Sequence, residues 1–245
     1  EIENGMIVRI AKNDEKYFKK YKNDVFKFEN LTLIPGFIQT HIHLCQTLFR
    51  GLADDLELLN WLQLKIFPYE NAHNKNSLLV SVRLGINELL LSGTTTLLDM
   101  GSLHHQEVIF EELQSSGIRA IAGKCLIDEN DLFPEFKSDT KLELNEIYQL
   151  AKTYHNSSNG KIKYGFAPRF VLSCSEKLLK ESFKMKKDFA GSLYHTHSSE
   201  NKNEIAEVKR KHNKENIEYF DSIGVIDDHS VLAHCIHVND KETDL

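Results

Sequence analysis

The sequence lacks the features that mark membrane-spanning and nucleic-acid-binding proteins. It has no long apolar run and no block of lysine and arginine, and its formal net charge is −6 with a pI near 6.1. A membrane-spanning helix needs about 20 consecutive apolar residues, and a nucleic-acid surface needs clustered positive charge. We therefore expect neither a membrane nor a nucleic acid among the partners of this protein.

Cysteine is scarce as well, and none of it is arranged in a Cys-x-x-Cys spacing. Each of the four cysteines lies in or beside an apolar segment: Cys45, Cys125, Cys174 and Cys235. Scattered cysteines of this kind indicate reduced thiols rather than a disulfide framework. The sequence also shows no signal peptide pattern, internal repeat or low-complexity tract. We expect a cytoplasmic protein.

What the sequence does contain is a regular alternation of short strand-like runs and longer helical patterns. The strand candidates are 37–43, 94–99, 118–126, 162–167, 192–197 and 231–235, and the helical candidates are 56–66, 78–91, 107–113, 142–154, 177–187 and 204–220. Such alternation is typical of a parallel α/β architecture. We predict the first six β/α units of a (β/α)8 TIM-type barrel over residues 35–245. Two small strands at 6–10 and 25–28 predict part of a β subdomain over residues 1–34.

Two histidines stand two residues apart in Thr40-His41-Ile42-His43. In a strand, side chains at positions i and i+2 point to the same face. A hydrophobic strand with two inward histidines needs a compensating partner, and a divalent metal bound by neutral imidazoles is the commonest one. The pair therefore indicates a metal site, with an exposed polar strand as the alternative.

Further chemically capable residues follow the fifth and sixth predicted strands. His197 ends the fifth strand and His234 ends the sixth. Because the chemistry of a (β/α)8 barrel gathers at the C-terminal ends of its strands, these histidines and the first pair can converge on one point. Glu200 lies three residues beyond His197, where a carboxylate can shuttle protons beside a metal. His195 points the same way as His197, and we interpret it as a packed core histidine.

With these motifs the chain resembles the amidohydrolase superfamily, specifically its purine and triazine aminohydrolase branch, from about Pro35 to the end. The matching motifs are Pro-Gly-Phe at 35–37, His-x-His at 41–43, His-x-x-Glu at 197–200 and the histidine at 234. The resemblance implies that His41, His43 and His197 bind one divalent metal, Zn2+ in the first place, with Fe2+ and Mn2+ as alternatives. Glu200 and His234 are the implied catalytic residues.

The same resemblance implies an aspartate ligand after an eighth strand. The sequence ends at Leu245, before a seventh or eighth strand, and Asp99 and Asp128 follow the wrong strands. We therefore expect a fragment with an incomplete barrel that is inactive as it stands.

Two groups within this branch share features with the chain. Segments 46–55, 60–62 and 67–70 are similar to methylthioadenosine and adenosylhomocysteine deaminases, 5'-deoxyadenosine deaminases and triazine hydrolases. Segments 123–125, 132–135, 168–176 and 199–201 are similar to guanine deaminases. Lys124 stands where the methylthioadenosine group has an arginine, and Arg169 stands where that group has a histidine. This difference argues against ribose or thioether recognition of that group's kind.

Four residues are candidates for binding a substrate. By resemblance to guanine deaminases, Gln46, Arg169 and Phe170 hold a purine, and each has a plain alternative: polar packing, a rim salt bridge and core packing. Glu70 follows Pro68, which should end the preceding helix and let the carboxylate reach the mouth of the site. An exposed carboxylate at a helix start is the alternative. His104 and His105 fit a surface pair better than a pocket.

The predicted reaction is hydrolytic deamination of a purine base or nucleoside, such as guanine or a 5'-deoxyadenosine-like compound, with release of ammonia. A chlorohydrolase or another C–N hydrolase acting on triazine-like rings is an alternative with the same site. A metal-binding barrel protein without catalytic activity is another, because a fold does not determine a function. The expected partner is a small heterocyclic substrate, and exposed barrel helices are compatible with a homodimer.

Overall fold

The structure is a computed structural model that describes residues 1–12, 25–130 and 134–245. It divides the chain into two compact units, Glu1–Pro35 and Gly36–Leu245. The assignment of residues 1–34 to a β subdomain and of residues 35–245 to a barrel domain stays a prediction.

The first unit contains a short antiparallel hairpin. Its strands are β1 (Ile2–Glu3) and β2 (Met6–Ile7), joined by Asn4 and Gly5, which both have positive φ angles (52° and 78°). Asn-Gly favours this tight turn because both residues tolerate a left-handed backbone. The predicted strand at 6–10 is therefore shorter than expected and pairs with residues that precede it. The predicted strand at 25–28 is wrong, because this stretch has no strand, and most of the intervening turn lies outside the described residues.

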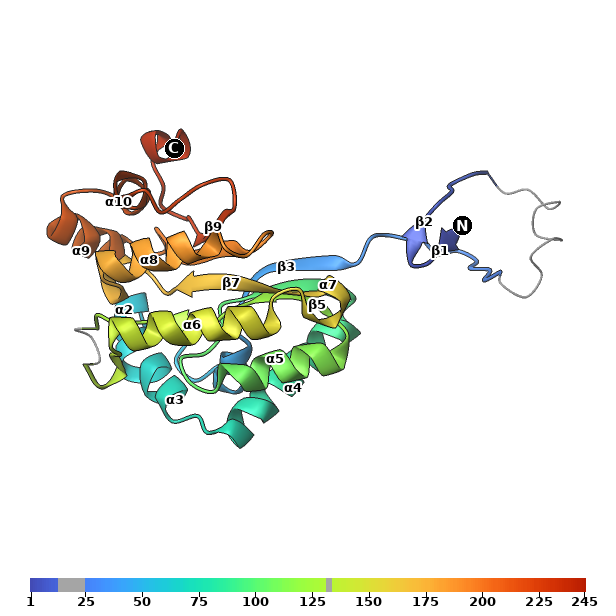
Figure 1. The fold of residues 1–245 in the computed structure, drawn as a ribbon, viewed down its shortest axis with the longest axis horizontal. Helices are drawn as coiled ribbons and strands as arrows, with labels where there is room; N and C mark the ends of the chain where they lie inside the picture. Colours follow the sequence, from blue (N-terminus) through green and yellow to red (C-terminus); the bar gives the residue numbers. More distant parts are fainter. Residues whose placement is uncertain (13–24, 131–133) are drawn as a thin grey trace. The chain divides into compact units, whose positions relative to one another are not determined.

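The second unit is built on a parallel sheet that curves toward a barrel (Figure 1). Its strands follow the order β3 (Phe37–Ile42), β4 (Thr94–Asp99), β5 (Arg119–Ala122), β7 (Ile162–Pro168), β8 (Leu193–Ser198) and β9 (Ser230–His234). Every pair along this path is parallel. The predicted TIM-type α/β fold is confirmed.

One predicted strand, 118–126, is divided into β5 and the two-residue β6 (Cys125–Leu126), which also pairs with β7. Gly123 lies at the break. A Cβ atom at this position would lie 1.6 Å from the carbonyl oxygen of Gly165 on the neighbouring strand. Only glycine permits so close an approach of two backbones, and the sequence pattern of alternating apolar residues does not reveal it.

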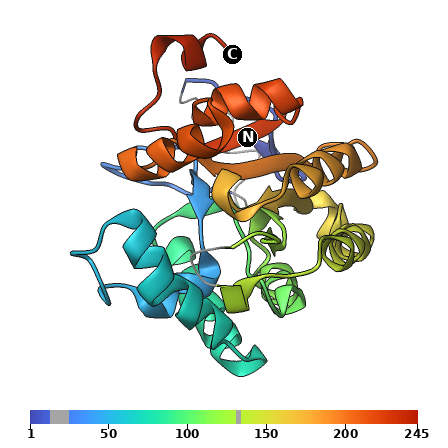
Figure 2. The same ribbon diagram turned by 90° about the vertical axis from the view of Figure 1, so that its left-hand side faces the viewer.

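The helices that connect the strands lie around the outside of the sheet (Figure 2). The main ones are α4 (Lys75–Leu91), α5 (Gln106–Ser116), α6 (Thr140–Tyr154), α8 (Glu176–Lys186), α9 (Lys202–His212) and α10 (Asn216–Ile223), with the short α7 (Ser157–Gly160) and α11 (Asp240–Thr243). The prediction of one helix over 204–220 is wrong. Asn213 adopts a left-handed conformation (φ 53°) that ends α9, as asparagine often does at a helix C-terminus.

The helical segment after β3 continues through a proline. It consists of α2 (Leu58–Trp61), the π-helical turn η2 (Leu62–Ile66) and α3 (Phe67–Asn71). The prediction that Pro68 ends this helix is wrong. The backbone N–H of Phe67 donates to the carbonyl of Leu62, five residues earlier, and a wider turn of this kind accommodates a proline that has no N–H to donate. As a result, Glu70 lies within a continuous helical segment.

The core fills the space inside the sheet and between the sheet and its helices. Its largest fully buried side chains include Tyr164, Tyr194, Phe110 and Phe166. Within the described residues, no helix combines the length and the apolar character that crossing a membrane requires.

Candidate metal centre and active site

Three imidazoles from two strands that are far apart in the sequence meet at the C-terminal ends of the strands. His41 and His43 come from the end of β3, and His197 comes from β8. Their nearest ligand atoms all lie within 4.8 Å of one another. The Nε2 atoms of His43 and His197 are 3.1 Å apart. Two nitrogens bound to the same tetrahedral zinc ion lie about 3.3 Å apart, so this spacing fits a shared ion.

The hydrogen bonds of His197 leave one ring nitrogen available as a ligand. Its Nδ1 lies 2.6 Å from the backbone carbonyl oxygen of Arg169. A carbonyl can only accept, so Nδ1 carries the proton and Nε2 keeps its lone pair toward His43. A metal-binding histidine is commonly held in this way, with the second nitrogen donating to a carbonyl or carboxylate.

Burial keeps these imidazoles neutral, which is the form that binds metals. For His41, burial lowers the pKa to about 4, helped by the nearby His234 and Arg169. Burial likewise lowers the pKa of His43 and His197 well below the usual range, with the neighbouring histidines and Arg169 acting in the same direction. The donor set therefore fits a divalent transition metal such as Zn2+, Fe2+ or Mn2+.

His195 is more closely connected to this centre than a core histidine would be. It is fully buried, as expected, but its Nε2 lies 2.9 Å from Nδ1 of His41. Its own Nδ1 is buried and makes no hydrogen bond to any described residue. Because His41 uses Nδ1 in this contact, its Nε2 is the nitrogen left for a metal.

Glu200 and His234 face each other beside the three imidazoles. Oε2 of Glu200 and Nε2 of His234 are 3.4 Å apart, and both side chains are about three-quarters buried. Burial raises the pKa of Glu200 and lowers that of His234. The backbone at Ser199 and His234 has positive φ (53° and 74°), a conformation that non-glycine residues adopt at a cost and often at functional sites.

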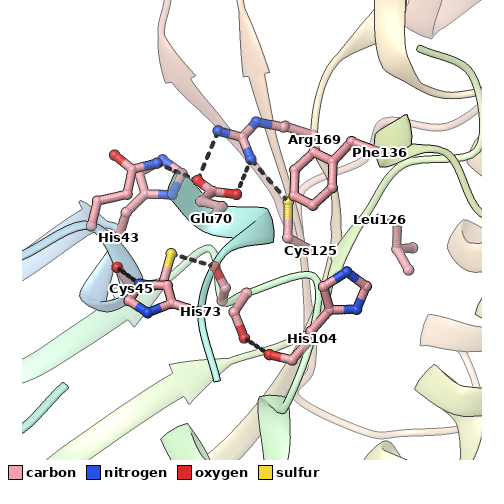
Figure 3. Close-up of polar contacts among 12 residues, drawn as sticks. His43, Cys45, Glu70, His73, His104, Cys125, Leu126, Phe136 and Arg169 are labelled. Atoms are coloured by element: carbon pink, nitrogen blue, oxygen red, sulfur yellow. Dashed lines mark hydrogen bonds and ion pairs between the residues drawn. The ribbon is translucent and has the colours of Figure 1, made fainter. Parts of the chain in front are cut away.

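Glu70 and Arg169 form a buried ion pair beside this cluster (Figure 3). The guanidinium donates from Nη1 to Oε2 of Glu70 at 2.8 Å and from Nη2 to Oε1 at 3.1 Å. Gln46 donates from Nε2 to Oε1 of Glu70 at 2.6 Å, and the guanidinium lies over the ring of Phe67 at 5.0 Å. The alternatives of an exposed helix-start carboxylate and a rim salt bridge are wrong, because side-chain exposure is only 2% for Glu70 and 3% for Arg169.

A cavity of about 230 Å3 opens over these groups. All the predicted site residues except Glu70 line it: His41, His43, Gln46, Arg169, Phe170, His197, Glu200 and His234. Leu58, Trp61 and Leu62 add an apolar wall that the sequence analysis did not assign to the site. The sequence does place these three apolar residues in the same helical segment as Glu70, which could have indicated a wall of the site. A stripe of apolar residues on a helix usually packs into a core, however, so the pattern alone did not assign them.

Three other residues considered in the sequence analysis do not line this cavity. Lys124 is buried, and its Nζ donates to Glu143 of α6 at 2.6 Å, so this side chain is directed to a helix and does not line the cavity. His104 is exposed and His105 is partly exposed, which agrees with a surface pair.

A second group of possible metal ligands consists of His43, Cys45 and Glu70. Burial raises the pKa of the Cys45 thiol well above its usual range, and Sγ donates to the carbonyl of Gly101. The thiol stays protonated, and Glu70 is already paired with Arg169. The three-histidine cluster is therefore the better metal site.

Comparison with known proteins agrees with this geometry. Residues 32–245 match the amidohydrolase family. The chain is 35% identical over 213 residues to a 5'-deoxyadenosine deaminase of Methanothermobacter thermautotrophicus, covering 87% of this chain and 48% of the relative. It is 33% identical over 211 residues to a 5-methylthioadenosine/S-adenosylhomocysteine deaminase of Thermoanaerobacter pseudethanolicus, covering 86% and 47%.

Among solved structures, guanine deaminase from C. acetobutylicum with guanine bound in its active site superposes with a TM-score of 0.84. It is 32% identical, and the match covers 92% of this chain and 55% of that one. The chain thus spans about half the length of the curated relatives that it matches.

Proposed function

The chain belongs to the amidohydrolase family, and from this premise we propose that the protein is a metal-dependent aminohydrolase that removes an amino group from a purine ring by hydrolysis. The observation that carries the proposal is the convergence of three neutral imidazoles with the facing pair Glu200 and His234 around one cavity. A closed structural metal site would have no need of an acid–base pair beside it.

His41, His43 and His197 are the residues proposed to hold the metal. When bound, a divalent metal supplies a hydroxide at neutral pH by lowering the pKa of water from about 16 toward about 7. Zn2+ is the metal that we propose, because histidine nitrogens are common ligands in catalytic zinc sites.

We assign the acid–base roles to Glu200 and His234. With its pKa raised by burial, the carboxylate of Glu200 takes up a proton more readily near neutral pH than an exposed one. It can accept a proton from water and deliver it to the ring nitrogen next to the carbon under attack. His234 faces this carboxylate at 3.4 Å and can orient it and stabilise the charge that develops. Hydrolysis at the amidine carbon then leaves a carbonyl group and ammonia.

For the substrate we propose a free purine base such as guanine, with a 5'-deoxyadenosine-like nucleoside as the second candidate. Both oxygens of Glu70 are occupied by Arg169, and one of them also by Gln46. The carboxylate is also buried and does not line the cavity, so it does not face a ribose hydroxyl there. Gln46 still has its side-chain carbonyl for the N–H edge of a base, and Phe170 offers a ring at the cavity wall.

Ammonia release by the full-length protein tests the function. Guanine, adenosine and 5'-deoxyadenosine would be compared at equal concentration, together with a chlorinated triazine assayed for chloride. We expect ammonia from guanine first, and loss of both metal and turnover in His197→Ala. His104→Ala, at an exposed histidine that lies outside the cavity and outside the groups of possible metal ligands, is the matched control and should retain both. Metal and turnover retained in His197→Ala would contradict the metal assignment, and chloride release without deamination would contradict the reaction.

A further inference from the structure

Asp99 is a buried carboxylate that ends β4 and accepts hydrogen bonds from two backbone N–H groups. Its side chain lies beneath the sheet's C-terminal edge with 1% of the residue exposed. Oδ1 accepts from the backbone N–H of Leu44 at 2.8 Å, and Oδ2 accepts from that of Gly101 at 3.0 Å. The first of these bonds joins β4 to the residue that directly follows His43.

Leu44 begins the short 3-10 helix η1 (Leu44–Phe49), and His43 is its N-cap residue. The first N–H groups of a helix have no partner within the helix. The side chain of His43 makes no capping bond to them, and its Nε2 lies 3.1 Å from Nε2 of His197. Asp99, from the neighbouring strand, accepts from the N–H of Leu44, the first residue of this helix.

The carbonyl group of Leu44 is hydrogen-bonded as well. The carbonyl of Leu44 accepts from Oγ of Ser81, a buried residue of α4, at 2.8 Å and from Oγ1 of Thr47 at 3.1 Å. Leu44 is therefore fixed between β4 on one side and α4 on the other. Since Leu44 is bonded covalently to His43, these contacts restrict the backbone from which the imidazole projects.

We propose that Asp99 is a positioning residue of the metal centre. By accepting from the backbone N–H of Leu44 it fixes the backbone next to His43, and so holds the His43 imidazole toward His197. The inference rests on the proposed metal site. It adds a residue that touches neither metal nor substrate and acts through the backbone of a ligand.

The test compares Co2+ binding by the full-length wild type and Asp99→Asn, using competition with a chromophoric chelator and the visible absorption of bound Co2+. Asparagine has the same size, but it keeps one acceptor oxygen and turns an NH2 group toward the other backbone N–H. We expect the affinity of Asp99→Asn to fall by about 10-fold or more, the size of effect seen when partners behind metal ligands are removed. The Co2+ absorption should change as well, because the orientation of a ligand changes.

Asp128→Asn is the matched control. Asp128 is also buried, and its carboxylate accepts from the backbone N–H of Ser175 at 2.7 Å and from Oγ1 of Thr140 at 2.7 Å. Neither partner adjoins a histidine of the cluster. This variant should lose stability, as Asp99→Asn does, but should bind Co2+ with the affinity and spectrum of the wild type.

Unchanged Co2+ affinity and absorption in folded Asp99→Asn would overturn the inference while the proposed metal site stands. A wild type that binds no metal would overturn both. If Asp99→Asn does not fold, the double variant Ser81→Ala/Thr47→Val decides, because it removes both hydroxyl groups that donate to the carbonyl of Leu44. A weakened Co2+ affinity in this double variant supports the positioning of His43 through Leu44, and an unchanged affinity contradicts it.

Discussion

Arg169 and Glu70, which are 99 residues apart in the sequence, form a doubly hydrogen-bonded ion pair with both side chains almost completely buried. The pair joins the end of β7 to the helical segment that follows β3. It sits beside the three-histidine cluster, and Nδ1 of His197 donates to the backbone carbonyl of the same arginine. Arg169 thus connects the proposed base-binding wall with a proposed metal ligand.

Breaking this pair should destabilise the protein. In Glu70→Gln the guanidinium of Arg169 stays buried without a compensating charge, and such a change costs about 3–5 kcal/mol. Urea unfolding followed by circular dichroism would measure the loss. Glu112→Gln, which breaks the more exposed pair with Arg83, is the control and should cost no more than about 1 kcal/mol. Equal effects of the two changes would show that the buried pair adds no stability of its own.

The metal should depend on His43 more than on His195. His43 is a proposed ligand. His195 is not, and it contacts Nδ1 of His41, the ring nitrogen that is not assigned to the metal. We expect His43→Ala to lose the metal, and His195→Gln to retain it with an affinity lower by about 10-fold. Metal content after dialysis, measured by mass spectrometry, distinguishes the two. A His43→Ala protein with a full complement of metal would contradict the proposed ligand set.

Glu200→Gln should abolish most of the deaminase activity without loss of metal. The amide keeps the size of the side chain but cannot take up or deliver a proton, and loss of a general acid–base group typically lowers kcat about 10²–10⁴-fold. The measurement is steady-state ammonia release together with metal content. Glu207→Gln, at a partly exposed position on α9, serves as the control. Activity within a factor of two of the wild type would exclude Glu200 as the proton shuttle.

Stability should fall at alkaline pH because of Cys125. Burial raises the pKa of this thiol from 9.0 to about 12, against the smaller effect of the nearby Arg169. The folded form therefore holds its proton while the unfolded chain releases it. This contribution is fully present below pH 9 and is lost as the pH rises toward 12, by up to about 1.4 kcal/mol per pH unit for one proton.

The check on this effect is urea unfolding at pH 8 and pH 10 for the wild type and for Cys125→Ala. The variant should lose less stability between the two pH values than the wild type does. Cys235→Ala, at a half-buried thiol, should follow the wild type more closely. An identical drop in the wild type and in Cys125→Ala would show that this thiol does not contribute.

Local sequence patterns were sufficient for most of the barrel. The strand at 94–99 was predicted with the bounds of β4, and the predicted ends of β3, β7, β8 and β9 are correct to one residue. The third strand of the path, β5, ends four residues before its predicted range does. Alternation of apolar residues depends only on near neighbours, so it can be read without a structure. The breaks at Gly123 and Asn213 and the passage through Pro68 were not predicted, because each depends on a close approach of backbones or on a single unusual backbone conformation.

The candidate site, too, could be predicted only in part from local sequence patterns. The sequence by itself determined that His41 and His43 share one face of a strand, since the spacing of two residues places them there, and that His197 and His234 end later strands of a parallel sheet. Only the tertiary structure decided that His195 contacts His41 across 154 residues, that Glu70 is paired with Arg169, and that Asp99 caps Leu44. These contacts join residues far apart in the chain, and their partners are chosen by how the strands and helices pack, which no local pattern records.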